Sequence, residues 1–273
     1  MSELLLIERQ PLGHGFAEYW RLNAPATRNA LSDEMVQALL QACARAEADQ
    51  GLRAIVLTGS GGHFCAGGSL GSFSGAIGKP CESGATDPLI AVNRGFGRLL
   101  QALAGLPQQL VVAVQGAAMG GGVGLVCTAD VVLASADASF ATPEVTLGIV
   151  PAQIAPFVLR RLGEARAREW LLGGQRWTAD QALAAGLVNQ VVAGDFETQI
   201  QARLALCSAA APGAVAATKA LLAAVPKQSL DAVLDQGAQA FAQALRGTEA
   251  AAGLTAFANK RPAPWAAGQE MKA

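Results

Sequence analysis

The residues that could carry out chemistry are concentrated between positions 111 and 151. A β-branched run ends at Gln115, and the glycine cluster MGGGVG at 119–124 opens a helix of small residues. The free N–H groups and positive dipole of such a helix start can stabilise a negatively charged oxygen, and glycine lets that oxygen approach closely. Glu144 is the only carboxylate between 138 and 151, in an apolar stretch where desolvation disfavours its charged form. An oxyanion site with one proton-transferring carboxylate suits chemistry at an acyl thioester.

A second glycine-rich segment, CAGGS at 65–69, follows the predicted strand at 53–58. In a parallel sheet this loop and the loop that follows the strand at 110–114 emerge at the same carboxyl edge, where ligands bind. Two N–H donors that converge there would form an oxyanion hole. Either loop alone is explained as well by tight turns and helix packing. The two loops together, followed by Glu144, favour a functional interpretation.

Several other sequence motifs lack residues that the corresponding sites would need. The segment at 67–71 matches the G-x-S-x-G nucleophile elbow of serine hydrolases, but a histidine must follow the serine, and both His14 and His63 precede Ser69. Cys65 has no candidate base except His63, so we expect a packed residue rather than a nucleophile. Neither a P-loop nor a dinucleotide-binding G-x-G-x-x-G is present. Two histidines and five scattered cysteines without metal-like spacing predict no metal site.

Composition excludes several classes of protein. The 273 residues carry a net charge of −1 without a basic stripe, which argues against nucleic-acid binding. No run of 18 apolar residues predicts a membrane span, and the start MSELLLIERQ lacks the cationic region of a signal peptide. The odd, scattered set of cysteines is typical of a reduced, cytoplasmic protein.

Hydrophobic periodicity predicts an α/β fold. Strands at 4–8, 16–22, 53–58, 110–114 and 130–135 alternate with helices at 33–49, 89–104 and 120–129, which indicates a mostly parallel sheet with crossover helices. A long glycine- and serine-rich loop covers 59–86, and long loops in compact domains are usually functional. One short strand, at 187–192, interrupts predicted helices at 152–162, 164–172, 178–184, 195–210, 212–224, 229–246 and 247–258. We therefore predict a core at 1–195 and a helical region at 196–273, whose alanine-rich helices are too apolar to stand alone and would pack on other subunits.

The segment FANKRPAPW at 257–265 permits two interpretations. The plain one is an exposed helix end with cations on its dipole. The sharper one is a nucleotide clamp, with Phe257 on a base and Lys260 on a phosphate.

Taken together, these pieces resemble a known family. RNALSDEMV (28–36), AIVLTGSGGHFCAGG (54–68), VVAVQGAAMGGGVGL (111–125), ADVVLASADASFATPEVTLGIVP (129–151) and FANKRPAPW resemble the crotonase superfamily, the enoyl-CoA hydratase/isomerase group, in their order and spacing. The resemblance implies a spiral of ββα units, a C-terminal helical trimerisation region, and a homotrimer or a dimer of trimers.

The resemblance also implies an acyl-CoA thioester substrate, with coenzyme A as part of the substrate and no separate cofactor. It places the oxyanion donors at the N–H groups of Gly68 and Gly121, with Glu144 as the proton carrier. Contacts to the adenine and phosphates would come from Arg28, from the backbone near Ala66, and from Phe257 and Lys260 of a neighbouring subunit.

One departure from the family pattern concerns the acid groups. Hydratases of this family carry two glutamates, and the first falls on Gly124 here. GGGVGLV, followed by PAQIAPFVLRRLG at 151–163, is most similar to bacterial hydratases of 3-methylglutaconyl-CoA and isohexenylglutaconyl-CoA, which belong to leucine and acyclic terpene breakdown. We expect Gly124 to make room for the C3 substituent of such substrates. A Δ3,Δ2-enoyl-CoA isomerase, which needs one base, and a non-catalytic acyl-CoA-binding protein are the alternatives.

Overall fold

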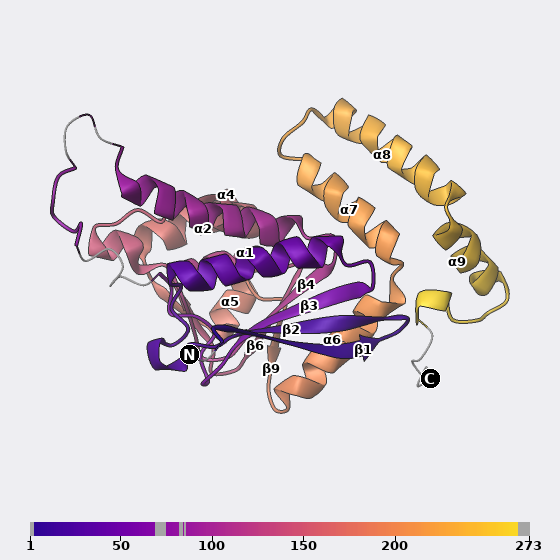
Figure 1. The fold of residues 1–273 in the computed structure, drawn as a ribbon, viewed down its shortest axis with the longest axis horizontal. Coiled ribbons are helices and arrows are strands. Elements are labelled where there is room, and N and C mark those ends of the chain that lie inside the picture. Colours follow the sequence, from indigo (N-terminus) through magenta and orange to yellow (C-terminus); the bar gives the residue numbers. More distant parts are fainter. Residues whose placement is uncertain (1–2, 69–74, 82–83, 85, 267–273) are drawn as a thin grey trace.

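A six-stranded sheet forms the centre of the protein, described here by a computed structural model that covers residues 3–68, 75–81, 84 and 86–266 (Figure 1). Its strand order is β1-β2-β3-β4-β6-β9; β1 and β2 are an antiparallel hairpin, and the remaining neighbours are parallel. The predicted α/β class is confirmed. The strands are β1 (Leu5–Leu12), β2 (Gly15–Leu22), β3 (Leu52–Gly59), β4 (Gln109–Val114), β6 (Val131–Ser135) and β9 (Gln190–Val192).

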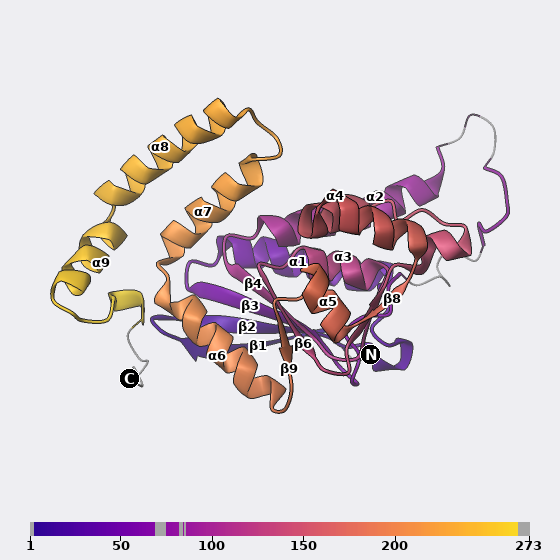
Figure 2. The same cartoon turned by 180° about the vertical axis from the view of Figure 1, so that it is seen from behind.

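Helices cover both faces of this sheet. In the fully buried strand β3, Ile55 and Leu57 join the larger core cluster with the first four helices, whereas Ala54 and Val56 join the smaller cluster with α6 (Phe196–Ala209). Figure 2 shows α6 lying across the sheet. Although α6 belongs to the predicted C-terminal region, its apolar residues therefore complete the core. The first four helices are α1 (Asp33–Ala48), α2 (Pro88–Gly105), α3 (Gly121–Cys127) and α4 (Ala155–Gly173).

The helix boundaries follow local signals in the sequence. Ser32 caps α1 as predicted, since its hydroxyl accepts the N–H of Met35 at 3.2 Å. The predicted helices at 152–162 and 164–172 appear as α4, which is kinked at Gly163, where φ is 74°. Glycine tolerates this left-handed conformation, so the chain can change direction there.

A second sheet of three short strands lies beside the first, and the sequence pattern did not reveal it. Its order is β5-β7-β8, with β5 and β7 parallel and β7 and β8 antiparallel. Three residues are too few to show a period of two. These strands are β5 (Ala117–Met119), β7 (Ser139–Ala141) and β8 (Arg176–Thr178), and α5 (Ala179–Ala185) follows them.

The last three long helices, α7 (Pro212–Ala224), α8 (Leu230–Arg246) and α9 (Thr248–Ala258), extend away from the sheet (Figure 1). Lys219 ties α7 to the core through the carboxylate of Asp130 and, at 2.6 Å, the carbonyl of Gln108. Large apolar side chains on these helices are exposed: Leu222, Leu230, Leu234, Phe241, Leu245, Leu254 and Phe257. Within the described residues no single helix is long and apolar enough to cross a bilayer. Taken together, α6 and α7 reach that length and apolarity, but they are bent by 95° relative to each other.

Close packing explains one glycine of the predicted glycine helix. A β-carbon on Gly122 would lie 2.6 Å from the Cys65 carbonyl oxygen and 3.0 Å from the Cys65 Cβ. Because the first of these contacts is with backbone, it cannot be relieved by a side-chain rotation. Gly122 therefore lets α3 rest directly on the chain at Cys65.

Gly122→Ala should lower the free energy of unfolding by about 1–3 kcal/mol, the usual cost of overpacking a core. Gly105→Ala is the matched control, because nothing lies within 4 Å of its β-carbon position and alanine favours the helix. Urea unfolding of both variants measures the difference. Equal stability of the two would contradict the packing role of Gly122.

Candidate active site

Two loops from distant parts of the sequence are joined through their backbones at the edge of the sheet. The N–H of Cys65 donates to the carbonyl of Ala117 at 2.9 Å, and the N–H of Met119 donates to the carbonyl of Cys65 at 2.9 Å. This pairing sets residues 65–68 beside residues 117–121. A β-carbon built on Gly121 would lie 3.6 Å from the backbone nitrogen of Gly68, so the two glycines border the same gap.

The N–H groups of Gly68 and Gly121 are available to a ligand. Gly121 is the first residue of α3, and the first N–H groups of a helix have no acceptor within the helix. The neighbouring N–H groups are occupied, that of Gly120 by the carbonyl of Ala141 at 2.8 Å and that of Ala66 by the carbonyl of Arg28 at 2.9 Å. Among the described residues, nothing accepts a hydrogen bond from Gly68 or Gly121. Two adjacent unpaired donors can stabilise an oxyanion.

Glu144 lies against Gly120, the residue before one of these donors, and lines the same cavity as both. It belongs to the short 3₁₀ turn Pro143–Leu147, and a β-carbon on Gly120 would be 2.9 Å from its Oε1 atom. The Oε2 atom is buried without a hydrogen-bond partner among the described residues. Burial raises the pKa of Glu144 above its usual value, and only the hydrogen bond from its own backbone N–H acts against this shift. A carboxyl with a raised pKa and a free oxygen is suited to exchanging protons with a ligand.

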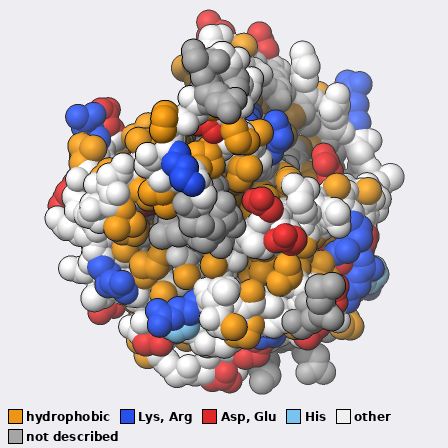
Figure 3. All heavy atoms as spheres, turned by 60° about the vertical axis from the view of Figure 1, so that its left-hand side comes forward, with side chains coloured by type: hydrophobic (Ala, Val, Ile, Leu, Met, Phe, Trp, Pro, Cys, Tyr) orange, Lys and Arg blue, Asp and Glu red, His pale blue; other side chains and the backbone are white. Residues whose placement is uncertain are grey.

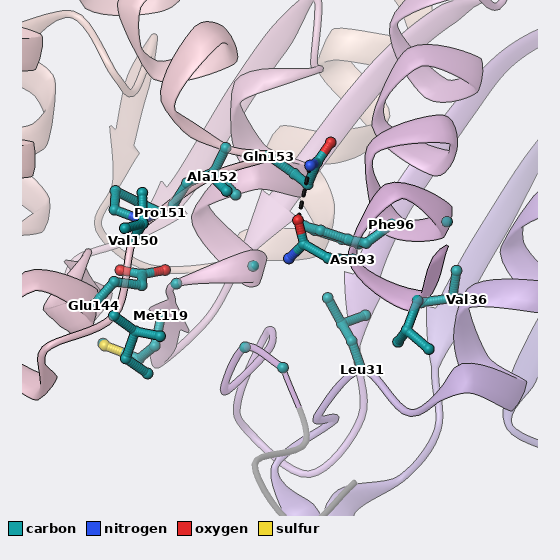
Figure 4. Close-up of a pocket in the computed structure, with 18 of the residues that line it drawn as sticks. Leu31, Val36, Asn93, Phe96, Met119, Glu144, Val150, Pro151, Ala152 and Gln153 are labelled. Atoms are coloured by element: carbon teal, nitrogen blue, oxygen red, sulfur yellow. Dashed lines mark hydrogen bonds between the residues drawn. The ribbon is translucent and has the colours of Figure 1, made fainter. Parts of the chain in front are cut away.

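These groups open into one cavity of about 540 Å³ (Figure 4). Leu31, Val36, Phe96, Met119 and Val150 supply much of its apolar wall. Figure 3 views the molecule from the end where α2 begins, and hydrophobic side chains gather on that face. A mostly apolar cavity with a few polar groups is typical of a small-molecule site.

The space beside Gly124 is filled, which corrects one prediction. A β-carbon there would lie 2.6 Å from Cγ2 of Ile154 and 3.3 Å from Cδ1 of Leu100. Ile154 is buried and itself lines the cavity, whereas Gly124 does not. The expectation that Gly124 makes room for a substrate substituent is therefore wrong, because a β-branched side chain occupies that room. Where the family pattern has its first glutamate, this protein has an apolar wall.

The thiol of Cys65 is a packed group, as predicted. It is fully buried, and burial raises its pKa to about 12. Its Sγ accepts the N–H of Gly67 at 3.4 Å, which helps to hold the loop.

Ser69, the serine of the rejected hydrolase motif, lies outside the described residues. Within the described ranges no three His, Cys, Asp or Glu side chains form a cluster that could hold a metal ion.

The four residues predicted to bind coenzyme A do not all meet within one chain. Ala66 lines the cavity, and Arg28 lies beside it through the backbone hydrogen bond described above. Phe257 and Lys260 lie at the end of α9, on the opposite side of the molecule from the start of α2 (Figure 1). Phe257 is 83% exposed, which leaves it available to another molecule.

Several polar side chains of the cavity wall were not predicted as site residues, among them Asn93 of α2 and its partner Gln153. Gln153 donates from Nε2 to Oδ1 of Asn93 at 2.8 Å. An asparagine on a helix with one apolar side has the pattern of an ordinary exposed residue.

Comparison with known proteins identifies the family. The enoyl-CoA hydratase/isomerase family profile matches residues 18–268. An enoyl-CoA hydratase/isomerase from Marinobacter aquaeolei superposes with a TM-score of 0.90 at 40% identity, over 97% of this chain and 100% of that one. AtuE from Pseudomonas aeruginosa gives 0.89 at 43% identity, with the same coverage. The 2,3-dehydroadipyl-CoA hydratase of Escherichia coli is 32% identical over 96% of this chain and 97% of its own length. The chain therefore belongs to the enoyl-CoA hydratase/isomerase family of the crotonase superfamily.

Proposed function

We propose that this enzyme adds water to the double bond of a 3-branched glutaconyl-type acyl-CoA, such as 3-methylglutaconyl-CoA or isohexenylglutaconyl-CoA. The observation that carries the proposal is that the buried, unpaired Oε2 of Glu144 shares one cavity with the free N–H groups of Gly68 and Gly121. Coenzyme A enters as part of the substrate, and the residues assigned to the reaction need no separate cofactor.

In the proposed reaction the thioester oxygen accepts hydrogen bonds from Gly68 and Gly121. Glu144 removes a proton from a water molecule while the water oxygen bonds to C3, and the π electrons move toward the thioester oxygen as an enolate. The protonated Glu144 then returns this proton to C2, which restores the carboxylate and completes the addition of water. Each oxyanion donor of this kind contributes about 2.7–4 kcal/mol of transition-state stabilisation in a well-studied protease.

Two observations support a substrate with a free carboxylate. The E. coli relative is named for a dehydroadipyl thioester, whose acyl group is a dicarboxylic acid. The wall of the cavity includes the amide groups of Asn93 and Gln153 and the guanidinium of Arg98, which suit a carboxylate. Glutaconyl-type esters arise in leucine and acyclic terpenoid breakdown, and we assign the enzyme to such a pathway.

The compartment proposed for the enzyme is the cytoplasm. The thiols of Cys43, Cys65 and Cys207 are buried and free, which fits a reducing compartment.

A Δ3,Δ2-enoyl-CoA isomerase is the second candidate, and Ile154 is the observation that favours it. Isomerisation moves one proton from C2 to C4 and needs a single base, so an apolar wall in place of a second acid suits it. A non-catalytic acyl-CoA-binding protein would have no use for a carboxyl with a raised pKa beside two free donors.

We further propose that the enzyme acts as a homotrimer or a dimer of trimers. The exposed Leu230, Leu234, Phe241 and Leu245 of α8 form the kind of apolar surface that subunit contacts cover. Phe257 and Lys260 would then reach the coenzyme A of a neighbouring subunit.

Turnover of two esters separates the candidate functions. With 3-methylglutaconyl-CoA, a hydratase yields a product heavier by one water molecule, detected by mass spectrometry. With an unbranched 3-enoyl-CoA, an isomerase yields a product of unchanged mass that has the ultraviolet absorbance of a conjugated thioester. We expect the first result to be the faster reaction. Isomerisation alone would overturn the hydratase proposal, and binding without turnover of either ester would overturn both.

Glu144→Gln should reduce kcat by about 10²–10⁴-fold, since it removes the proton carrier but keeps the volume. The exposed Glu169→Gln is the matched control.

Because burial raises the pKa of Glu144 above its usual value, the acidic limb of the pH profile of kcat/KM should lie at higher pH than for an ordinary glutamate. The same shift predicts that ionised Glu144 disfavours folding above its raised pKa, so Glu144→Gln should not lower the melting temperature at neutral pH. Wild-type activity in Glu144→Gln would remove this residue from the mechanism.

Phe257→Ala should raise KM for acyl-CoA esters without changing the cavity of its own chain. If Phe257 acts between subunits, oligomers reassembled from mixed Phe257→Ala and Glu144→Gln chains should regain sites of normal KM. In such a site Glu144 comes from the first chain and Phe257 from the second. Refolded mixtures assayed against each variant alone measure this. A fully active monomer, or no recovery in mixed oligomers, would contradict the arrangement.

A further inference from the structure

The side chains of Asn93 and Gln153 form a hydrogen-bonded amide pair in the wall of the cavity. Asn93 belongs to α2, and Gln153 lies two residues before α4. Nε2 of Gln153 donates to Oδ1 of Asn93 at 2.8 Å (Figure 4). The pair therefore bridges two elements that are 60 residues apart in the sequence.

Gly97 of α2 provides the space that Gln153 needs. A β-carbon on Gly97 would lie 2.0 Å from Oε1 of Gln153 and 2.9 Å from Nη1 of Arg94. A glycine inside a helix is less stable than alanine, so the position is costly unless the bare Cα is used. Here it lets the carbonyl end of the Gln153 amide rest on the helix, beside the Arg94 guanidinium.

The direction of these contacts makes Asn93 a donor toward the cavity. Its Oδ1 accepts the hydrogen bond from Gln153, which turns Oδ1 toward Gln153 and leaves both N–H bonds of Nδ2 for other partners. Among the described residues nothing accepts a hydrogen bond from Nδ2 of Asn93. Figure 4 shows this amide nitrogen projecting into the cavity on the side of Glu144. The nearby charge of Arg94 polarises the pair in the same sense.

A pair of amides that offers donors suits an anionic oxygen and not the activation of water. Activating water requires a base for its proton, and an amide oxygen is too weak a base for that role. The acyl part of a neutral enoyl thioester has no oxygen beyond the thioester carbonyl. A free carboxylate at the far end of the acyl group would supply the acceptor for these N–H groups, and hydrogen bonds to a charged acceptor are among the stronger ones.

We propose that Nδ2 of Asn93 binds the free carboxylate of the acyl group, and that Gln153 and Gly97 are positioning residues for it. This inference rests on the proposed function only in the choice of a dicarboxylic acyl thioester. It makes the amide pair the element that separates carboxylated from neutral esters.

The test uses unreactive saturated esters, so that binding is measured apart from turnover. Titration calorimetry on the intact protein compares the affinity for 3-methylglutaryl-CoA with that for isovaleryl-CoA, which lacks the free carboxylate. The wild type should bind the carboxylated ester more tightly. Asn93→Asp replaces the donor by a charge that repels a carboxylate. It should weaken binding of the carboxylated ester by about tenfold or more and leave the Kd of isovaleryl-CoA nearly unchanged. As a control, Gln41→Glu on the exposed side of α1 adds the same charge away from the cavity, and it should leave the affinity for both esters unchanged.

Gln153→Met and Gly97→Ala test the positioning role. Methionine keeps the volume of Gln153 but cannot donate to Asn93, and the added methyl of Gly97→Ala displaces the Gln153 amide while favouring the helix. Both should reduce the preference for 3-methylglutaryl-CoA, and melting curves of Gly97→Ala should show no loss of stability.

Three results would overturn the proposal: no preference in the wild type, equal weakening of both esters in Asn93→Asp, or an unchanged preference in both Gln153→Met and Gly97→Ala. Failure of the hydration assay with a retained binding preference would reject the hydratase function and keep the carboxylate site.

Discussion

The backbone pairing between Cys65 and β5 is the constraint on which the site depends. It joins the loop after β3 to the segment after β4 with two hydrogen bonds of 2.9 Å, and so sets the separation of Gly68 and Gly121. A change of register by one residue would turn one of these N–H groups out of the gap. The bare Cα of Gly122 allows α3 to follow at once, packed on Cys65. The fold and the proposed oxyanion site are therefore set by the same few backbone contacts.

Two carboxylates show how the fold separates a fully paired structural acid from the proposed proton carrier. Glu18 is 1% exposed, and its oxygens accept from Arg9 at 2.9 Å, from the Trp20 indole at 2.7 Å and from Arg45 at 3.4 Å. Glu144 is less buried, yet it keeps one oxygen without a partner among the described residues. Satisfied groups hold a structure together, whereas an unsatisfied buried acceptor is costly unless a ligand completes it.

Much of the architecture could be predicted from the sequence because strong periodicity marks it. The alternation of apolar strands with helices gave the α/β class, and Ser32 marked the start of α1. The strands of the small sheet escaped prediction because three residues show no period. The two converging glycine loops were predictable from parallel-sheet geometry, as was the unusual environment of Glu144. That position 124 is closed by Ile154 was not, because contacts between distant side chains leave no trace in a local pattern.

The burial of Cys65 has a consequence for the survival of the enzyme. The C3 atom of an enoyl thioester that accepts water is also an electrophile toward sulfur, and the proposed binding mode places the thioester at Gly68, on the loop that carries this thiol. Only the thiolate is a strong nucleophile. Because burial raises the pKa of Cys65 to about 12, the group stays protonated at neutral pH and is enclosed by protein. The fold thus keeps a cysteine in the loop of the proposed oxyanion site without exposing that cysteine to alkylation by an enoyl thioester.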